Sequence, residues 1–224
     1  MYFENKEELE NLIQKVRDIL SPLVKFEGLK VGENGFYIVV GVSNRHIHLC
    51  KEHLEILFGN GYQLTKLREL RQPGQFACRE TVNVVTSDGI LEGVRVLGPL
   101  RSKTQFELSL TDARRLRINP PVVKSGSNVR IDKPVVVVGP RGSVVLEEGV
   151  CIAWRHIHLS PEEARLLGLR DGEEIEVEAE GERAVIFRRV WVRVDKSFVS
   201  EFHIDTDEAN ACGLKTGDYV RLLI

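Results

Sequence analysis

The sequence contains one pentapeptide twice: Arg-His-Ile-His-Leu occupies residues 45–49 and again residues 155–159. Four of the six histidines of the 224-residue chain lie in these two copies, so chance is a poor explanation for the repeat. Each copy follows an apolar run, FYIVVGVSN or EGVCIAW, which predicts the end of a buried strand. Residues i and i+2 of a strand share a face, so each copy presents two imidazoles side by side, as half of a metal site would.

The composition excludes several classes of function. A net charge of −2 argues against a general nucleic-acid-binding face, and 42% hydrophobic with 29% charged residues is ordinary for a soluble protein. No apolar run is long enough to cross a membrane, and the N-terminus lacks the features of a signal peptide. The cysteines form no C-x-x-C pair, which predicts reduced thiols in a cytoplasmic protein; they are Cys50, Cys78, Cys151 and Cys212.

Residues 1–21 predict an amphipathic helix, because their apolar residues recur at three-and-four spacing and Pro22 follows. Two interpretations remain open for this helix. It is either a packing helix or dimer contact, or a detachable tail that docks onto a larger assembly.

From Phe36 onward the pattern changes to short strands separated by turn signals, which favours small β-barrels over a parallel sheet. The proline-rich stretch from 119–121 to 132–134 is either a seam between domains or a functional loop. The clearest predicted strands are 82–86, 93–97, 135–138, 143–146, 174–178 and 190–194.

Helix-start signals recur after the strands. Ser160 followed by Pro161 is the strongest, and Thr111 and Thr206 open similar segments. With the segment after Cys50, they indicate four strand-then-helix units. Counting six residues back from the same helical position in each unit leads to four side chains that can bind a metal: His48, Glu107, His158 and His203.

Adding the other histidine of each pentapeptide predicts two three-ligand metal sites. Three ligands leave a position open, as catalytic sites do, and imidazole with carboxylate suits Zn²⁺, with Fe, Co and Mn left open. In a competing interpretation these histidines only cap the polar ends of barrels. The predicted sets are His46, His48 and Glu107, then His156, His158 and His203.

A second motif overlaps the first pentapeptide. Residues 46–59 fit H-x-H-x3-E-x6-G, counting Glu52, which is close to the first metal motif of cupins. In cupins that glutamate continues the strand, whereas Glu52 and Glu162 fall in predicted helix starts. A cupin-like metalloenzyme is therefore kept only as an alternative.

Longer segments resemble the phosphate propanoyltransferases of the propanediol-utilisation type, phosphotransacylases associated with bacterial microcompartments. The resemblance spans about residues 36–224 and rests on GVSNRHIHL, QLTKLRELRQPGQFACRETV, VRVLGPLRSKTQFELSLTDA, WRHIHLSPEE, ARLLGLRDGE and FHIDTDEANACGL. It implies a mainly β fold: two small β-barrels capped by short α-helices, behind the N-terminal amphipathic helix. The implied division is an N-terminal extension over 1–35, one barrel from 36–45 with 153–224, and another from 46–152.

The resemblance also implies roles for particular residues. Two zinc ions per chain are expected on the two sets named above, with CoA at the junction of the barrels. Arg101 is expected to face phosphate, with Arg193 and Gln105 also catalytic. The residues expected to contact substrate or CoA are Ser43, Gln72, Gln75, Ser125 and Asn210. The chain departs from the expected pattern at Arg68, where a lysine is expected, and at Trp154 and Cys212.

The implied reaction converts acyl-CoA and phosphate into acyl phosphate and CoA. The sequence has no G-x-S-x-G and no cysteine with an evident base, which favours direct attack by phosphate. Propanoyl and acetyl groups differ by one methylene, worth about 1–3 kcal/mol in a pocket, so the acyl preference stays open. A homodimer and a location in the cytoplasm, inside a microcompartment, are further expectations. The alternative is a metal-binding or assembly protein that keeps the fold without turnover.

Overall fold

The computed structural model describes residues 27–224. The predicted helix at residues 1–21 lies outside the described residues. The first strand among the described residues is β1 (Leu29–Gly32), which precedes the predicted Phe36 because this segment forms a hairpin with β2 (Gly35–Ser43) and buries Leu29. Part of the predicted N-terminal extension over 1–35 is therefore a strand.

One sheet closes into a six-stranded barrel, in the order β2-β15-β12-β14-β13-β16. Pairing of β16 with β2 completes the ring, and β1 adds a seventh strand along β2. The other barrel strands are β12 (His156–Leu159), β13 (Glu174–Ala179), β14 (Val185–Val194), β15 (Glu201–Asp205) and β16 (Tyr219–Leu223).

The middle of the chain forms a second, nine-stranded sheet that curves into a half-barrel. Its order is β10-β9-β5-β6-β3-β7-β11-β8, and β4 pairs with β5. The prediction of a mainly β fold with barrels and short helices is confirmed, with one barrel closed. The strands are β3 (His46–His48), β4 (Lys66–Glu69), β5 (Phe76–Val85), β6 (Ile90–Gly98), β7 (Gln105–Glu107), β8 (Val122–Val123), β9 (Arg130–Val138), β10 (Ser143–Glu148) and β11 (Val150–Ala153).

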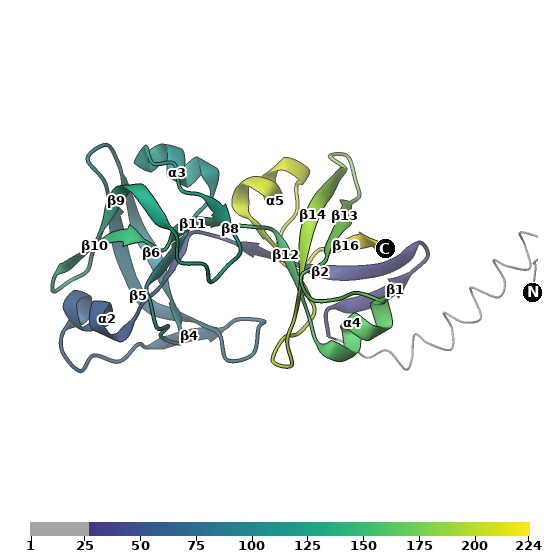
Figure 1. Cartoon of the computed structure of the whole chain (residues 1–224), viewed down its shortest axis with the longest axis horizontal. Helices are drawn as coiled ribbons and strands as arrows, with labels where there is room; N and C mark the ends of the chain where they lie inside the picture. Colours follow the sequence, from purple (N-terminus) through teal and green to yellow (C-terminus); the bar gives the residue numbers. More distant parts are fainter. Residues whose placement is uncertain (1–26) are drawn as a thin grey trace, which may run out of the picture.

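The chain crosses between the sheets twice, and the two bodies lie side by side with the crossings between them (Figure 1). The barrel strand β2 leads directly into β3 of the half-barrel, and β11 of the half-barrel leads into β12 of the barrel. Each copy of the repeated pentapeptide therefore begins at a crossing. This arrangement brings both histidine pairs to the junction.

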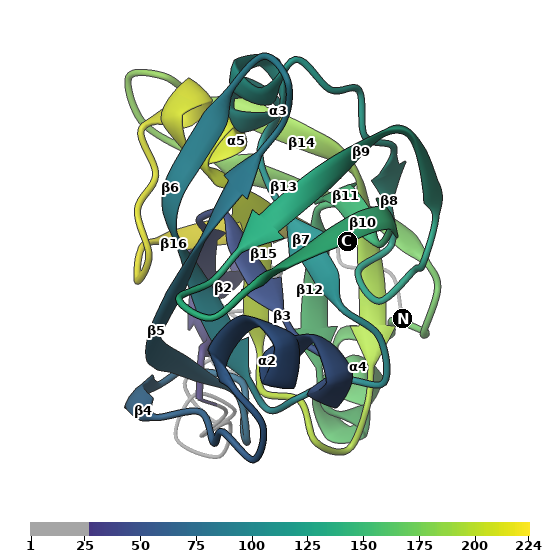
Figure 2. The same cartoon turned by 90° about the vertical axis from the view of Figure 1, so that its left-hand side faces the viewer.

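Four short helices follow four of these strands, as the repeat predicts: α2 (Lys51–Phe58), α3 (Leu110–Leu116), α4 (Pro161–Leu167) and α5 (Thr206–Cys212). Capping boxes at Ser160 and Asp205 start α4 and α5, and Ser109 caps α3. Left-handed glycines, Gly168 and Gly213, end α4 and α5. Helices α3 and α5 lie together on one side of the molecule in both views (Figures 1 and 2), where the Thr111 amide donates to Asp207.

Each sheet has its own buried apolar cluster. Phe202, Ile38 and Ile157 lie in the cluster of the barrel, whereas Phe106 and Ile47 lie in that of the half-barrel. Burying such side chains removes apolar surface from water at about 25 cal/mol per Å², so each cluster stabilises its own sheet. The predicted domain boundaries, after residue 45 and after residue 152, remain a prediction.

Within residues 27–224, no helix combines the length and apolar character needed to span a bilayer.

Candidate active site

Strand register places the predicted ligands next to one another in both sheets. In the half-barrel, antiparallel pairing sets His46 opposite Glu107. In the barrel, the corresponding pairing sets His156 opposite His203. Residues opposite each other on antiparallel strands lie about 4.5–5.5 Å apart at Cα, so the third ligand of each set comes beside the first.

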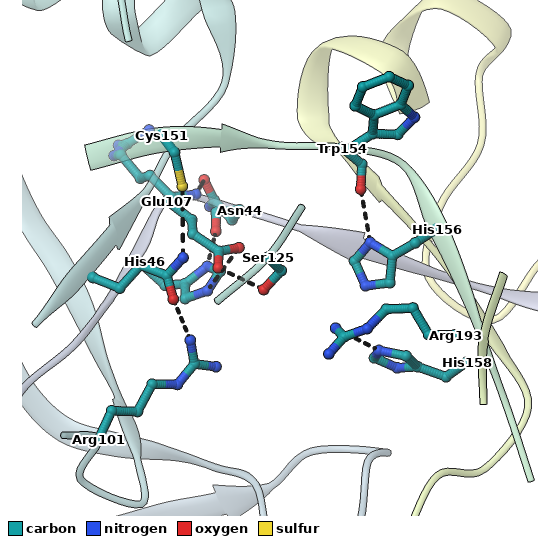
Figure 3. Close-up of polar contacts among 12 residues, drawn as sticks. Asn44, His46, Arg101, Glu107, Ser125, Cys151, Trp154, His156, His158 and Arg193 are labelled. Atoms are coloured by element: carbon teal, nitrogen blue, oxygen red, sulfur yellow. Dashed lines mark hydrogen bonds and ion pairs between the residues drawn. The ribbon is translucent and has the colours of Figure 1, made fainter. Parts of the chain in front are cut away.

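Both predicted ligand sets line one cavity of about 190 Å³ between the two sheets. Figure 3 shows the His46 and Glu107 group on one side and the His156 and His158 group facing it. The other residues that line this cavity are Ser43, Gln72, Gln75, Leu97, Arg101, Ser125, Ala153, Trp154, Arg193, Phe198, Ile204 and Asp205.

The first set is held by hydrogen bonds to backbone and side chain. The Nδ1 of His46 donates to the carbonyl of Asn44 at 2.9 Å, which leaves Nε2 facing Glu107 at 3.6 Å. Ser125 donates to the other carboxylate oxygen of Glu107 at 2.9 Å (Figure 3). His48 lies 5.3 Å from His46, ring to ring, and burial, followed by its charged neighbours, lowers its pKa to about 2.

The second set is more compact. Among residues 27–224 it is the single group of three such side chains whose ligand atoms all lie within 4.8 Å of one another. His156 Nδ1 donates to the carbonyl of Trp154 at 2.7 Å, the counterpart of the His46 bond to Asn44. Burial, with repulsion from His203, lowers the pKa of His156 and of His158, so both imidazoles are neutral at pH 7 and keep a lone pair.

The arginine of each pentapeptide forms an ion pair with the helix that follows the third ligand. Arg45 pairs with Asp112 of α3 at 3.1 Å, and Arg155 pairs with Glu208 of α5 at 2.7 Å. Both acidic residues stand five positions after the third ligand of their own set. Burial raises the pKa of Glu208 to about 7 despite Arg155 beside it. Each ion pair therefore connects a crossing of the chain to a helix of the half that the chain enters there.

Two guanidinium groups face the cavity. Arg101 donates to the side-chain oxygen of Gln105, and the Nη1 of Arg193 lies 3.2 Å from the Nε2 of His158. Burial lowers the pKa of both arginines. Because arginine starts from about 12.5–13.8, both side chains remain charged at neutral pH. Two half-buried cations on one small cavity favour an anionic ligand.

Glu201 is a buried residue of the site that the sequence analysis missed. Its Oε2 lies 2.8 Å from the Nε2 of His203 and accepts a 2.8 Å hydrogen bond from Gln72. Burial favours the neutral acid, but the hydrogen bonds from His203 and Gln72 prevail and lower the pKa of Glu201. The signal available in the sequence was its position two residues before the third ligand, where the other half has Gln105.

The remaining predicted contacts divide into three groups. Ser43, Gln75 and Ser125 line the cavity directly. Gln72 also lines it, but its amide exchanges hydrogen bonds with the backbone of Val199 as well as with Glu201. Gln105 lies buried behind Arg101 rather than on the cavity wall, and Asn210 is exposed on α5 away from it.

The positions that depart from the expected pattern also have defined places. Trp154 lines the cavity and donates from Nε1 to the carbonyl of Arg189 at 2.7 Å. Cys212 is buried at the end of α5, and Arg68 is exposed beside a second cavity. The cupin alternative fails at the glutamates, because Glu52 and Glu162 are exposed in the first turns of α2 and α4.

None of the four cysteines, all within residues 27–224, lines the cavity. Cys151 is connected to the cavity only through Gln105, which donates to its sulfur at 3.7 Å and accepts from Arg101 (Figure 3). Burial and the neighbouring Glu107 raise the pKa of Cys151 to about 12, and burial raises that of Cys78 to about 11. Both sulfurs are therefore thiols at neutral pH and poor nucleophiles.

One of the two predicted sets has the spacing of a divalent metal site. The Nδ1 atom of His48 is buried and has no hydrogen-bond partner among the described residues, whereas the Nε2 lone pair of His158 faces the guanidinium of Arg193. Buried polar atoms are normally paired, and a neutral imidazole with a free lone pair is the usual nitrogen ligand of zinc. The compact set of His156, His158 and His203 fits such an ion best.

Comparison with known proteins shows to which family the chain belongs. The profile of the phosphate propanoyltransferase family matches residues 39–215. The chain is 48% identical over 215 residues to the phosphate propanoyltransferase of Thermotoga maritima, covering 96% of this chain and 98% of that protein. It is 48% identical over 193 residues to that of Lachnoclostridium phytofermentans (86% and 90% covered) and 44% identical over 221 residues to that of Rhodopseudomonas palustris (97% of each). The chain therefore belongs to the phosphate propanoyltransferase family, a family of acyltransferases.

Proposed function

We propose that this protein catalyses the reversible reaction of acyl-CoA with phosphate to give acyl phosphate and CoA. The names of its relatives supply the reaction class and the propanoyl group. The observation that carries the proposal is the single cavity that collects Arg101, Arg193 and both histidine sets. It combines groups for a phosphate with groups for a thiolate within one small space.

The two arginines suit the phosphate. A guanidinium presents several donors in a plane and bonds to phosphate oxygens in pairs. Arg101 is oriented by Gln105, and Arg193 is packed with its charge 5.2 Å from the ring centres of both Trp191 and Phe198. Such support holds each cation in place before the substrate arrives, which reduces the cost of ordering it.

A second cavity suits the nucleotide portion of CoA. It measures about 410 Å³ and shares Ser43, His46 and Leu97 with the first cavity. Its lining includes three arginines, Arg45, Arg68 and Arg95. CoA carries phosphate groups at one end and its sulfur at the other. We place the phosphates beside these arginines and the thioester at the shared residues.

The chemistry proceeds by direct attack. An oxygen of hydrogen phosphate forms a bond to the thioester carbonyl carbon, the carbon–sulfur bond breaks, and sulfur leaves with the electron pair. The proton lost by phosphate ends on the CoA thiol, and no oxidation occurs. The protonated, buried thiols of Cys78 and Cys151 support this route over an acyl-cysteine.

We propose that His156, His158 and His203 hold one zinc ion and that His46, His48 and Glu107 hold a second. Zinc, when bound, supplies a Lewis acid that stabilises a thiolate or the charge on a carbonyl oxygen. The residues of the chain prepare these positions: the Asn44 and Trp154 carbonyls fix the tautomers of His46 and His156.

The direct test measures thiol release from propanoyl-CoA with and without phosphate, before and after chelation and return of zinc. Release that requires both phosphate and the metal is the expected result. Release without phosphate would indicate a thioesterase instead. Zinc binding without thiol release would favour a metal-binding or assembly role. Repeating the assay with acetyl-CoA defines the acyl preference.

The homodimer and the location in a cytoplasmic microcompartment are further parts of the proposal, and the resemblance alone supports them. Sedimentation of the purified protein tests the dimer. Co-fractionation with microcompartments, with and without residues 1–21, tests the location and the role of this segment. A monomer, or fractionation outside the compartments, would refute the respective part.

A further inference from the structure

Glu201 has a counterpart in the other half of the molecule. Strand pairing sets His48 opposite Gln105 in the half-barrel and His158 opposite Glu201 in the barrel. The two positions are therefore equivalent in the internal repeat. Gln105 orients a charged side chain of the cavity, Arg101. The same position in the barrel is occupied by a carboxylate that contacts a histidine of the cavity.

We infer that Glu201 is a positioning residue: it fixes the tautomer and direction of His203, and Gln72, in the turn between β4 and β5, holds it in place. This inference rests on the proposed metal site only in its consequence for metal affinity. The effect of Glu201 on the tautomer of His203 depends only on contacts that the described residues make with one another.

The distances define the proton positions. A carboxylate only accepts hydrogen bonds, so the 2.8 Å contact between Glu201 Oε2 and His203 Nε2 requires a proton on Nε2. The lone pair of a neutral His203 is then on Nδ1. A histidine whose second nitrogen bonds to a carboxylate is a stronger and better oriented metal ligand. His156 uses the backbone carbonyl of Trp154 for the same purpose.

The structure leaves a defined space for this carboxylate. Gly41 on β2 is paired with His203, and a Cβ at Gly41 would overlap Oε1 of Glu201. The equivalent position beside Glu107 is Cys151, which has a side chain. A side chain is thus absent on the neighbouring strand at the place where the carboxylate of Glu201 lies.

Gln72 completes the arrangement from the half-barrel side of the junction. Its amide nitrogen donates to Glu201 at 2.8 Å and to the carbonyl of Val199 at 3.0 Å, and its oxygen accepts from the amide of Val199 at 3.3 Å. Gln72 and Glu201 are both buried. Five polar atoms of Gln72, Val199 and Glu201 thereby satisfy one another, which holds the carboxylate in one orientation.

The first test uses the full chain without metal, with ¹⁵N-labelled histidine. In the parent protein the imidazole shifts should show His203 protonated on Nε2. Glu201→Met removes the acceptor at similar length and should give a mixture of tautomers. Glu201→Gln keeps an acceptor oxygen and should restore most of the Nε2 form. An unchanged His203 spectrum in Glu201→Met would overturn the inference.

The second test measures Co²⁺ affinity by visible absorption against a competing chelator. Glu201→Met should bind about 10–100-fold more weakly, which is the usual effect of losing such a partner. Gln72→Met should shift the affinity in the same direction by less, and it serves if Glu201→Met does not fold. Glu163→Met, at a buried glutamate that caps α4, is the matched control and should bind Co²⁺ like the parent.

The two tests separate the inference from the metal proposal. Equal Co²⁺ affinity in Glu201→Met and the parent would overturn the inference. If the parent protein binds no Co²⁺ at its histidines, the metal proposal is refuted, and the tautomer of His203 alone decides the role of Glu201.

Discussion

At the scale of single residues, Arg101 is the side chain whose environment most directly suggests a substrate contact. It is charged and partly buried, and Gln105 orients its guanidinium toward the cavity. Its counterpart Arg193 faces the same cavity from the barrel side. Under the proposed function, both arginines would gain a partner of opposite charge on binding phosphate.

Replacing Arg101 should therefore weaken use of phosphate. Hydrogen bonds to a charged group are worth about 1.5–3 kcal/mol, so Arg101→Ala should lower kcat/KM for phosphate by roughly 10- to 150-fold. Steady-state kinetics with phosphate varied at saturating propanoyl-CoA measures the loss. Arg165→Ala on the exposed surface of α4 is the control and should behave like the parent. Equal values for both variants would remove Arg101 from the phosphate site.

Glu208 predicts a pH dependence of stability. Its pKa in the folded protein is about 7, raised mainly by burial, against an ordinary value of 4.5. Between these pH values the unfolded chain has lost the proton that the folded chain still holds, so this group makes stability fall as pH rises. Glu208→Gln removes the titration and keeps an oxygen for the cap of α5.

The difference in unfolding free energy between Glu208→Gln and the parent should therefore change in favour of the variant from pH 4.5 to pH 7. Urea unfolding at several pH values measures it. Parallel pH profiles for the two proteins would show that Glu208 does not titrate differently in the folded state.

The internal repeat was informative where it repeated a residue type, and the ligand roles inferred from it stay a prediction. His156 and His158 were found because they copy His46 and His48, and His203 because it shares their register. Glu201 was missed because its counterpart is a different amino acid, Gln105, and side-chain partners across sheets leave no periodic signal. Its bond to Gln72 joins residues 129 positions apart.

At the scale of elements, local signals were sufficient for the helices. Ser160 with Pro161 predicts the start of α4, and the structure adds the reciprocal bond from Glu163. The crossings of β2 into β3 and of β11 into β12 could not be derived from strand patterns alone. An apolar run predicts burial but does not define which sheet will receive the strand.

The cap of α4 offers a test at this scale. The hydroxyl of Ser160 accepts from the amide of Glu163 at 3.2 Å. Ser160→Ala should lower the unfolding free energy by about 0.5–2 kcal/mol, with kcat unchanged because the hydroxyl does not face the cavity. Chemical denaturation measures the loss, and the exposed Ser87→Ala is the comparison. A fall in kcat without a loss of stability would give this serine a different role.

At the scale of the whole molecule, the two sheets have separate cores but build one cavity. The crossings, the paired arginines and the contact of Gln72 with Glu201 all join them at this place. The site is thus assembled from both sheets, and neither sheet contains it alone. Ligands that bind here should stabilise the molecule as a unit.

Chelation followed by return of zinc tests this expectation. A ligand present at 100 times its Kd stabilises the folded state by about 2.7 kcal/mol, so zinc should raise the Tm of the chelated protein. His156→Ala should reduce this rise, because it removes a ligand from one of the two proposed sites. His53→Gln, at the histidine that bonds to Thr104 outside both sets, should keep it. An equal rise in both variants would place the metal elsewhere.

The most direct test of the central claim is isotope exchange between labelled CoA and propanoyl-CoA, with and without phosphate. Direct attack by phosphate predicts no exchange in its absence and rapid exchange once phosphate is added, with Arg101→Ala slowed. Exchange without phosphate would require an acyl group held on the protein, and it would contradict direct attack within the shared cavity.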